Sequence, residues 1–274
     1  MKKRRYGVLA LNSPYVLWSA IFIIVPLFIV GYYSFVDANG NFSIDNFIEI
    51  FKRKDYLNPM LRALWYSVVA TLIALLISYP FAYFLSKQCG MSQKIQMALI
   101  MVPMLTNLVI RTYSWANILE YNGLINKFLG LFGIEPLTMM GTSGAVIFGM
   151  VYNYLPYMIL PIYTVMSKID PSLLEAAEDL GCNGWNKLRR VIIPLSLPGV
   201  ISGITMVFVP SISTFYISQK LSDKKLIGDV IYNEMQELHN FNMGASLSFV
   251  LMVFIFASIL IMNKLSDEDG GVVL

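Results

Sequence analysis

The sequence predicts an all-α membrane protein built on six transmembrane helices, and two observations support this. Of the 274 residues, 57% are hydrophobic and only 14% are charged, with a mean hydropathy of +0.63. A soluble domain carries about 25% charged residues, so this chain has too few to cover a water-facing surface of its size. The charges are also spaced so that long uncharged windows separate them, and about 20 apolar residues suffice for one helix to cross a bilayer.

Five windows without Asp, Glu, Lys or Arg are each long enough to hold one span. They predict spans at about 15–35, 63–85, 144–166, 192–218 and 245–263. A sixth window, 95–110, ends at Arg111 and resumes beyond it, which we interpret as one helix at 95–118 carrying a single charge. The whole chain, 1–274, is expected to form a single membrane domain with short loops.

The orientation follows from the distribution of Lys and Arg. The first window follows the basic segment Met1–Arg5, but it is too long for a signal peptide and no Ala-x-Ala cleavage site follows it. Placing the N-terminus in the cytoplasm puts eleven basic residues in cytoplasmic segments and eight in outer ones, as the positive-inside rule favours. Six spans then return the C-terminus to the cytoplasm, so Cys89 and Cys182 are expected there as reduced thiols.

Several function classes are disfavoured by the residues that are missing. One histidine and two cysteines are too few for a His/Cys metal site or a disulfide scaffold. The sequence contains no Gly-Lys dipeptide, so it cannot form a Walker A loop, and we expect no cofactor bound by this chain. A net charge of +3 gives no sign of a nucleic-acid partner.

The loop at 167–194 carries the most informative pattern. Asp170 and Pro171 are typical of a helix start, and Gly181 is typical of a helix end with left-handed backbone. Asn183 can cap a second short helix, and Pro194 then marks the entry into the fifth span. The loop is either an interfacial connector between two spans or a rigid projection for a cytoplasmic partner, and the residues alone leave both open.

At this loop the sequence resembles permease subunits of bacterial ABC importers, the binding-protein-dependent transport inner-membrane components. That family carries Glu-Ala-Ala, three residues, Gly, nine residues, then Ile-x-Leu-Pro. Here Glu175-Ala176-Ala177, Gly181 and Val191-Ile192-Ile193-Pro194 have the same spacing, with Val for Ile and Ile for Leu as conservative departures.

The resemblance implies a type I ABC importer permease in the bacterial plasma (inner) membrane, with this loop as its coupling helix. It further implies a second permease subunit, two ATP-binding subunits that bind ATP and Mg, and an extracellular substrate-binding protein. By resemblance, the contact with the ATPase is made by Glu175, Ala176, Ala177, Asp179, Gly181 and Pro194.

Other strings extend the resemblance along most of the chain. The segments 78–85, 107–113, 155–158 and 215–218 are similar to the first permease subunit of spermidine/putrescine importers. A polyamine substrate is therefore implied. The alternatives are another small solute and, less favoured, a stand-alone secondary transporter, which would more often show intramembrane carboxylates or an internal repeat.

Candidate residues for the translocation path follow from the chemistry of a polyamine, which carries ammonium groups that aromatic faces and carboxylates attract. No carboxylate lies deep in any predicted span, so strong cation binding should need a partner subunit or an external receptor. Packing or an interfacial belt is the competing interpretation for each aromatic residue, and snorkelling is the alternative for the arginine. The candidates are Arg111, Tyr113, Trp115, Glu120, Tyr154, Tyr157, Phe215 and Tyr216.

Overall fold

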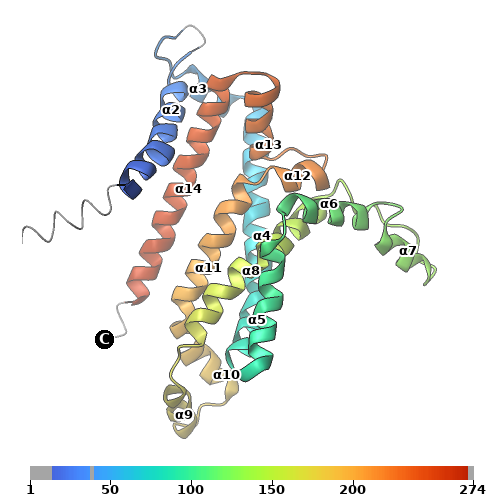
Figure 1. Ribbon diagram of the computed structural model, residues 1–274, viewed down its shortest axis with the longest axis vertical. Coiled ribbons are helices and arrows are strands. Elements are labelled where there is room, and N and C mark those ends of the chain that lie inside the picture. Colours follow the sequence, from blue (N-terminus) through green and yellow to red (C-terminus); the bar gives the residue numbers. More distant parts are fainter. Residues whose placement is uncertain (1–13, 38–39, 271–274) are drawn as a thin grey trace, which may run out of the picture. The chain divides into compact units, whose positions relative to one another are not determined.

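The computed structural model describes residues 14–37 and 40–270, with side chains up to Lys264. Within these ranges the chain is helical, and the only β-structure is two isolated bridges, Val36 with Phe42 and Gly141 with Ser222 (Figure 1). The predicted basic segment Met1–Arg5 lies outside the described residues.

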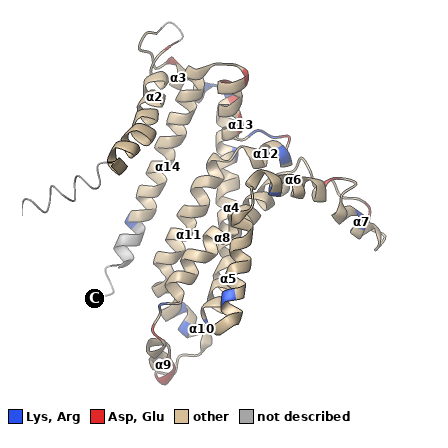
Figure 2. Cartoon of the chain, viewed as in Figure 1, with Lys and Arg blue, Asp and Glu red and all other residues tan. Residues whose placement is uncertain are grey.

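Five described helices are long and apolar enough to cross a membrane. Each overlaps one of the five spans predicted from the uncharged windows, and these helices carry few charges in Figure 2. They are Pro14–Ser34, α4 (Lys54–Ser86), α8 (Ser143–Met166), Gly184–Ser213 and Phe241–Lys264. The first includes the π-helix η1 (Ala20–Ile24) and α2 (Val25–Ser34), and the last is the apolar part of α14 (Phe241–Gly270).

The predicted single helix at 95–118 is wrong. The structure has α5 (Gly90–Leu105) and α6 (Leu108–Leu119), and the pair α5 and α6–α7 (α7, Leu124–Gly130) is bent by 93°. Thr106 and Asn107 are extended, and the Asn107 side chain accepts a hydrogen bond from the Val109 N–H at 2.7 Å, which caps a new helix. A window defined by charge cannot register such a cap, because Asn is uncharged.

The membrane-spanning helix at the predicted span 192–218 ends at Ser213, five residues earlier than predicted. Helix α11 (Ile193–Ser213) ends at Thr214, which is extended, and the short helix α12 (Tyr216–Leu221) begins two residues later. Helix α13 (Ile227–Tyr232) and the π-helix η3 (Asn233–Glu237) lead from there to α14.

The chain divides by its internal contacts into two compact units. One holds the described residues up to Leu57 together with Val230–Phe254. It includes α3 (Asp45–Lys52), and its centre is aromatic, because the Phe35 ring lies 5.0 Å from Phe47 and 5.4 Å from Phe249. Two hydrogen bonds tie its segments together, from Asn242 to the Val36 carbonyl and from Ser246 to the Ser34 carbonyl.

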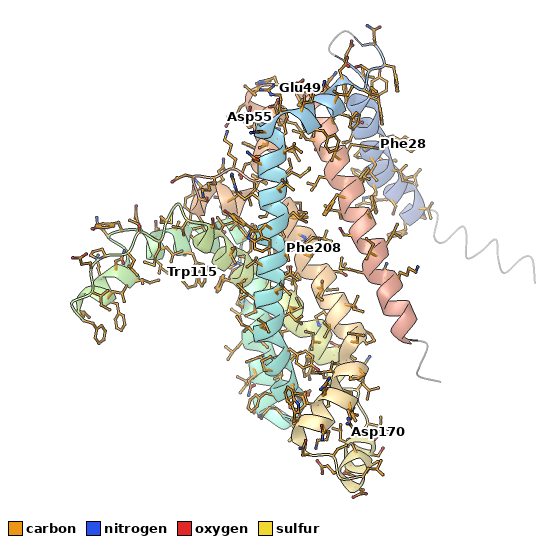
Figure 3. All side chains as sticks on the ribbon, turned by 180° about the vertical axis from the view of Figure 1, so that it is seen from behind. Phe28, Glu49, Asp55, Trp115, Asp170 and Phe208 are labelled. Carbon is orange, nitrogen blue, oxygen red and sulfur yellow. The ribbon has the colours of Figure 1, made fainter. Side chains whose placement is uncertain are left out.

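The other unit runs from Asn58 to Asp229 and resumes at Ile255. Its centre is the contact of α8 with α11, where Gly199 and Gly203 face Pro161 and Met158 so closely that an added Cβ would lie 2.8 Å from the nearest atom of each. The GxxxG spacing of these glycines therefore marks a real close helix contact. The loop between α8 and α11 lies at one end of this unit, where Asp170 is labelled in Figure 3.

Candidate functional site

The loop after α8 begins with α9 (Pro171–Asp179), and its start is as predicted. The Asp170 side chain accepts a hydrogen bond from the Ser172 N–H at 2.9 Å, and Pro171 occupies the first helical position. This hydrogen bond lowers the pKa of the Asp170 carboxyl, because it favours the ionised form. Aspartate there also complements the positive end of the helix dipole.

The end of α9 is fixed by Gly181. Its φ of +80° lies in the left-handed region that glycine adopts without strain. The Gly181 N–H donates to the Glu178 carbonyl at 2.8 Å and the Cys182 N–H donates to the Ala177 carbonyl at 3.0 Å. This pair of bonds is the Schellman motif, so the chain reverses sharply at a defined angle.

An ion pair that sequence reasoning missed braces the turn. The Lys187 ammonium, on α10 (Gly184–Lys187), donates to the Glu178 carboxylate on α9. The hydrogen bond from Lys187 lowers the pKa of Glu178, so the carboxylate stays charged at neutral pH. A spacing of nine residues across a turn has no helical periodicity, so only the structure reveals this contact.

The second short helix starts as predicted but does not end before the fifth span. Asn183 caps it by accepting from the Asn186 N–H at 2.8 Å. The helix then continues through the π-helix η2 (Leu188–Ile192) into α11, giving one continuous helix from Gly184 to Ser213. Pro194 is the second residue after the π turn, in the first turn of α11, and its missing N–H makes such a wider turn favourable.

The elbow formed by α9, the glycine turn and α10 exposes a mixed surface. Glu175, Ala176 and Asp179 are exposed, whereas Ala177 is buried against the rest of the loop. Two large apolar side chains also project outward, with Leu180 86% and Trp185 67% exposed. Exposed apolar side chains beside an accessible carboxylate are typical of a surface that another protein covers.

Three of the aromatic path candidates lie together where α6 meets α12. The Tyr113 and Tyr216 rings are 6.1 Å apart, and Phe215 packs edge-on to Tyr216 at 6.3 Å. The Lys220 ammonium lies over the Tyr113 ring, 4.7 Å from its centroid. Lys220 was not among the residues singled out from the sequence.

The other candidates lie apart from this group. Trp115 packs edge-on against Phe148 at 4.6 Å and Tyr152 at 5.1 Å, which joins α6 to α8 (Figure 3). Tyr154 is buried and its hydroxyl donates to the Pro210 carbonyl at 3.3 Å, while Tyr157 lies 6.5 Å from it and is 36% exposed. Glu120 is exposed at the end of α6.

Arg111 lies at the end of the first turn of α6, where its Nε and Nη1 are buried without a hydrogen-bond partner among the described residues. The guanidinium interacts electrostatically with Tyr154. A buried charge without a partner is costly in a membrane protein.

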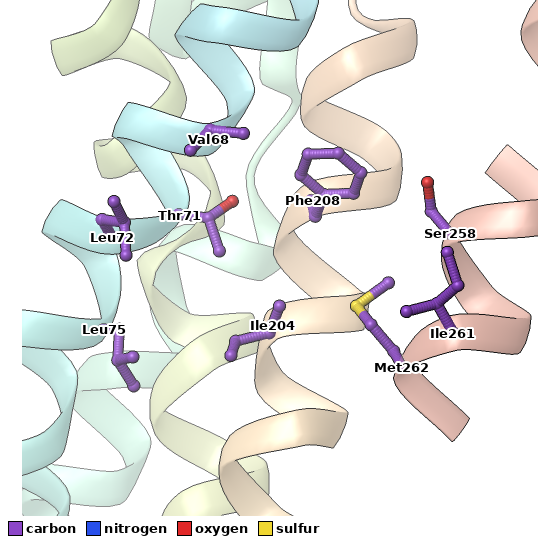
Figure 4. Close-up of a pocket in the computed structure, with 9 residues that line it drawn as sticks. All are labelled: Val68, Thr71, Leu72, Leu75, Ile204, Phe208, Ser258, Ile261 and Met262. Carbon is purple, nitrogen blue, oxygen red and sulfur yellow. The ribbon is translucent and has the colours of Figure 1, made fainter. Parts of the chain in front are cut away.

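An apolar pocket of about 330 Å³ lies between α4, α11 and α14 in the second unit (Figure 4). Its walls are almost wholly hydrocarbon, and the hydroxyl of its Thr71 donates to the Ser67 carbonyl at 2.7 Å. Such a pocket offers no carboxylate to an ammonium group, so we do not assign it to the path. Among the described residues, no cluster of His, Cys, Asp or Glu could hold a metal ion.

Comparison with known proteins identifies relatives over most of the sequence. The spermidine/putrescine transport system permease protein PotB of Haemophilus influenzae is 37% identical over 246 residues, which cover 86% of each chain. PotB of Escherichia coli is 35% identical over 247 residues, covering 86% of this chain and 89% of the relative.

Solved structures share the fold. A chain from the crystal structure of a bacterial ABC transporter involved in the import of the acidic polysaccharide alginate has a TM-score of 0.78 at 16% identity, covering 97% of this chain and 96% of that one. A chain of the inward-facing MetNI methionine ABC transporter has a TM-score of 0.61 at 13% identity, covering 78% and 95%. This confirms the predicted all-α permease fold of ABC importers.

A match to a family model identifies the family of the chain, which similarity of fold alone does not. Residues 92–267 match the family described as binding-protein-dependent transport system inner membrane component, whose members are transport permeases rather than enzymes. This match spans more than half of the sequence, and it includes the elbow and the α6–α12 contact. The chain therefore belongs to the family of binding-protein-dependent transport system inner membrane components.

Proposed function

We propose that this permease forms half of the translocation pathway of an ATP-driven importer of the polyamines spermidine and putrescine. The observation that carries the proposal is the elbow at 170–194, whose braced turn presents Glu175 beside exposed apolar side chains. The relatives named spermidine/putrescine permeases support the choice of substrate, because they match nearly the whole chain.

In this proposal the elbow is the contact for a separate ATPase subunit. Glu175 and Asp179 accept charged hydrogen bonds, and the exposed Leu180 and Trp185 fill apolar depressions on the partner. Because α10 continues into α11 without a break, a displacement of the elbow passes directly to a membrane-spanning helix. ATP and Mg are bound by the partner, and this chain transmits the movement of the ATPase to the membrane-spanning helix.

The remaining partners follow from the same scheme. A second permease completes the pathway and a substrate-binding protein delivers the polyamine at the outer face. We propose that a carboxylate of the second permease neutralises Arg111, since its buried nitrogens have no partner among the described residues. Alternating access then opens the pathway to each side in turn.

The substrate is tested by uptake into proteoliposomes that contain the complex purified from native membrane. We expect ATP-dependent uptake of radiolabelled spermidine that putrescine inhibits and sulfate does not. Inhibition by sulfate with no effect of putrescine would remove the polyamine assignment and leave the permease assignment standing. Purification of the chain without any ATPase would count against the importer itself.

The coupling role is tested by reversing one charge on the elbow. Glu175→Arg should abolish copurification of the ATPase and lower ATP-driven uptake at least about tenfold. The substitution replaces a carboxylate, which accepts charged hydrogen bonds, with a cation that repels the cationic donor on the ATPase. Glu135→Arg is the matched control, since Glu135 is also an exposed glutamate but lies in the loop before α8. If both variants keep the ATPase bound and transport normally, the elbow is not the contact.

A further inference from the structure

The contact of α6 with α12 joins two short helices, of which α6 follows the break in the bent pair and α12 follows the end of a membrane-spanning helix. Helix α6 starts after the extended pair Thr106 and Asn107, and α12 starts after the extended Thr214. In transporters, discontinuous helices commonly surround the substrate, because the break frees backbone and side chains to face it. Figure 1 shows α6 and α12 side by side, well away from the elbow.

At this contact the rings of Tyr113 and Tyr216, which we call the cage, lie together, and an ammonium group lies against one of them. Lys220 lies one helical turn after Tyr216 on α12 and reaches across to α6, where its Nζ lies over the Tyr113 ring at 4.7 Å. The Tyr113 and Tyr216 rings are inclined at 66° to one another, so they form two walls of a corner. Recognition of a cation by several aromatic faces is a general mode of ammonium binding.

Lys220 itself is charged and only partly buried. The hydrogen bond with the Tyr113 hydroxyl raises the pKa of Lys220, so the group is an ammonium at all physiological pH values. Tyr113 is 45% exposed, so the cage is open on one side and its occupant can exchange. An exposed cation–π contact is weak, so a competing ammonium can replace it.

The chemistry of the lysine side chain indicates what would compete. Four methylene groups ending in a primary ammonium are an aminobutyl arm, the unit that putrescine and spermidine also contain. We propose that the Tyr113–Tyr216 cage is a subsite for the aminobutyl arm of the substrate, and that Lys220 occupies it until the substrate displaces this side chain. This inference rests on the proposed function and adds to it a residue-level site with a built-in competitor.

The position of Arg111 does not oppose this assignment. Residues two apart on an α-helix point about 200° apart around its axis, so the guanidinium and the Tyr113 ring leave α6 on nearly opposite sides. The Arg111 guanidinium interacts with Tyr154 on α8, whereas Tyr113 faces α12.

The inference is tested by the reactivity of Lys220 towards an acylating reagent, measured by mass spectrometry on the intact complex in nanodiscs. Lys224 and Lys225 are exposed a few residues away and serve as internal references. An added amine also consumes reagent, but this slows all three lysines equally, so the ratio of their rates is unaffected. Without substrate, Lys220 should react about 2- to 5-fold more slowly than these references. Putrescine should remove this protection, whereas sodium chloride at equal ionic strength and the shorter 1,2-diaminoethane should not.

Two variants separate the cage from other causes of protection. Tyr113→Leu should expose Lys220 without any polyamine, whereas Tyr113→Phe keeps the aromatic face and should retain most of the protection. Unchanged Lys220 reactivity at putrescine concentrations that inhibit spermidine uptake would overturn the inference and leave the proposed function intact. Displacement of Lys220 by putrescine in a complex that imports no polyamine would support the cage and contradict the proposed substrate.

Discussion

Asp229 carries a buried carboxylate whose two oxygens have different surroundings. Its Oδ2 accepts hydrogen bonds from the Ser218 hydroxyl at 2.6 Å and from the Leu226 N–H at 2.7 Å. Its Oδ1 is buried with no hydrogen-bond partner among the described residues. Oδ2 therefore ties α13 to α12. Oδ1 has no hydrogen bond to replace its contacts with water, so its burial destabilises the folded state when the carboxylate is ionised.

The pKa of Asp229 gives this cost a pH dependence. Burial raises the pKa of Asp229, against the hydrogen bonds from Ser218 and Leu226 and the charge of Lys225. A raised pKa means that the folded state favours the protonated form. The resulting stabilisation is complete below the pKa of the unfolded group, about 3.9, and is lost as the pH rises through the raised value.

Asp229→Asn should therefore raise the free energy of unfolding at pH 7.5, and the gain should shrink as the pH falls towards 4. Asparagine keeps an oxygen acceptor for Ser218 and Leu226 but carries no charge to desolvate. Asp229→Ala removes both hydrogen bonds and should destabilise by about 1–3 kcal/mol. Thermal unfolding of the purified complex over this pH range measures both, and an Asn variant less stable than Asp at pH 7.5 would refute the argument.

The helix ends show which features of the structure can be predicted from neighbouring residues alone. Asp170, Gly181 and Asn183 could each be assigned a role from the sequence, because caps depend on residues within one turn of the helix. The breaks before α6 and α12 were missed because the uncharged windows record composition and not backbone hydrogen bonds. The Glu178–Lys187 brace and the Tyr113–Lys220 contact were missed because they join separate helices, and no periodicity of one element encodes them.

The packing of α8 against α11 gives a prediction at the scale of helices. A Cβ on Gly199 would lie 2.8 Å from the Pro161 carbonyl oxygen and 3.1 Å from the Ile162 Cα, both of them backbone atoms that cannot move aside. A Cβ on Gly203 would lie 2.8 Å from the Met158 sulfur, which belongs to a flexible side chain, and 3.2 Å from its carbonyl oxygen. The first glycine should therefore be the more sensitive.

We expect Gly199→Ala to destabilise the permease by about 1–3 kcal/mol through overpacking, and Gly203→Ala to cost less. Gly184→Ala is the control on the same continuous helix, since no atom lies within 4 Å of its added Cβ. Thermal unfolding midpoints of the three variants decide the order. If the unfolding midpoint falls equally in all three variants, Gly199 and Gly203 are not needed for the close contact of α8 with α11.

At the scale of the whole molecule, the number of crossings depends on the bent pair. Among the residues that the structure describes, five helices can each span a membrane, and a sixth span forms there only if α5 and α6–α7, bent by 93°, cross as one. The spacing of charges predicts six spans, which places Cys89, before α5, and Cys182, after α9, on the same side. With five spans and a re-entrant pair, these two cysteines lie on opposite sides.

Labelling of the two native cysteines in spheroplasts with a membrane-impermeant maleimide separates these topologies, since Cys89 is exposed and Cys182 half-buried. We expect neither to react until the membrane is permeabilised, because both are predicted to be cytoplasmic. Lys224→Cys, placed in an exposed loop one crossing beyond Cys182, should react in intact spheroplasts. Reaction of Cys182 but not Cys89 from outside would show that the bent pair turns back within the membrane. The cage at Tyr113 would then lie on a re-entrant segment instead of a broken span.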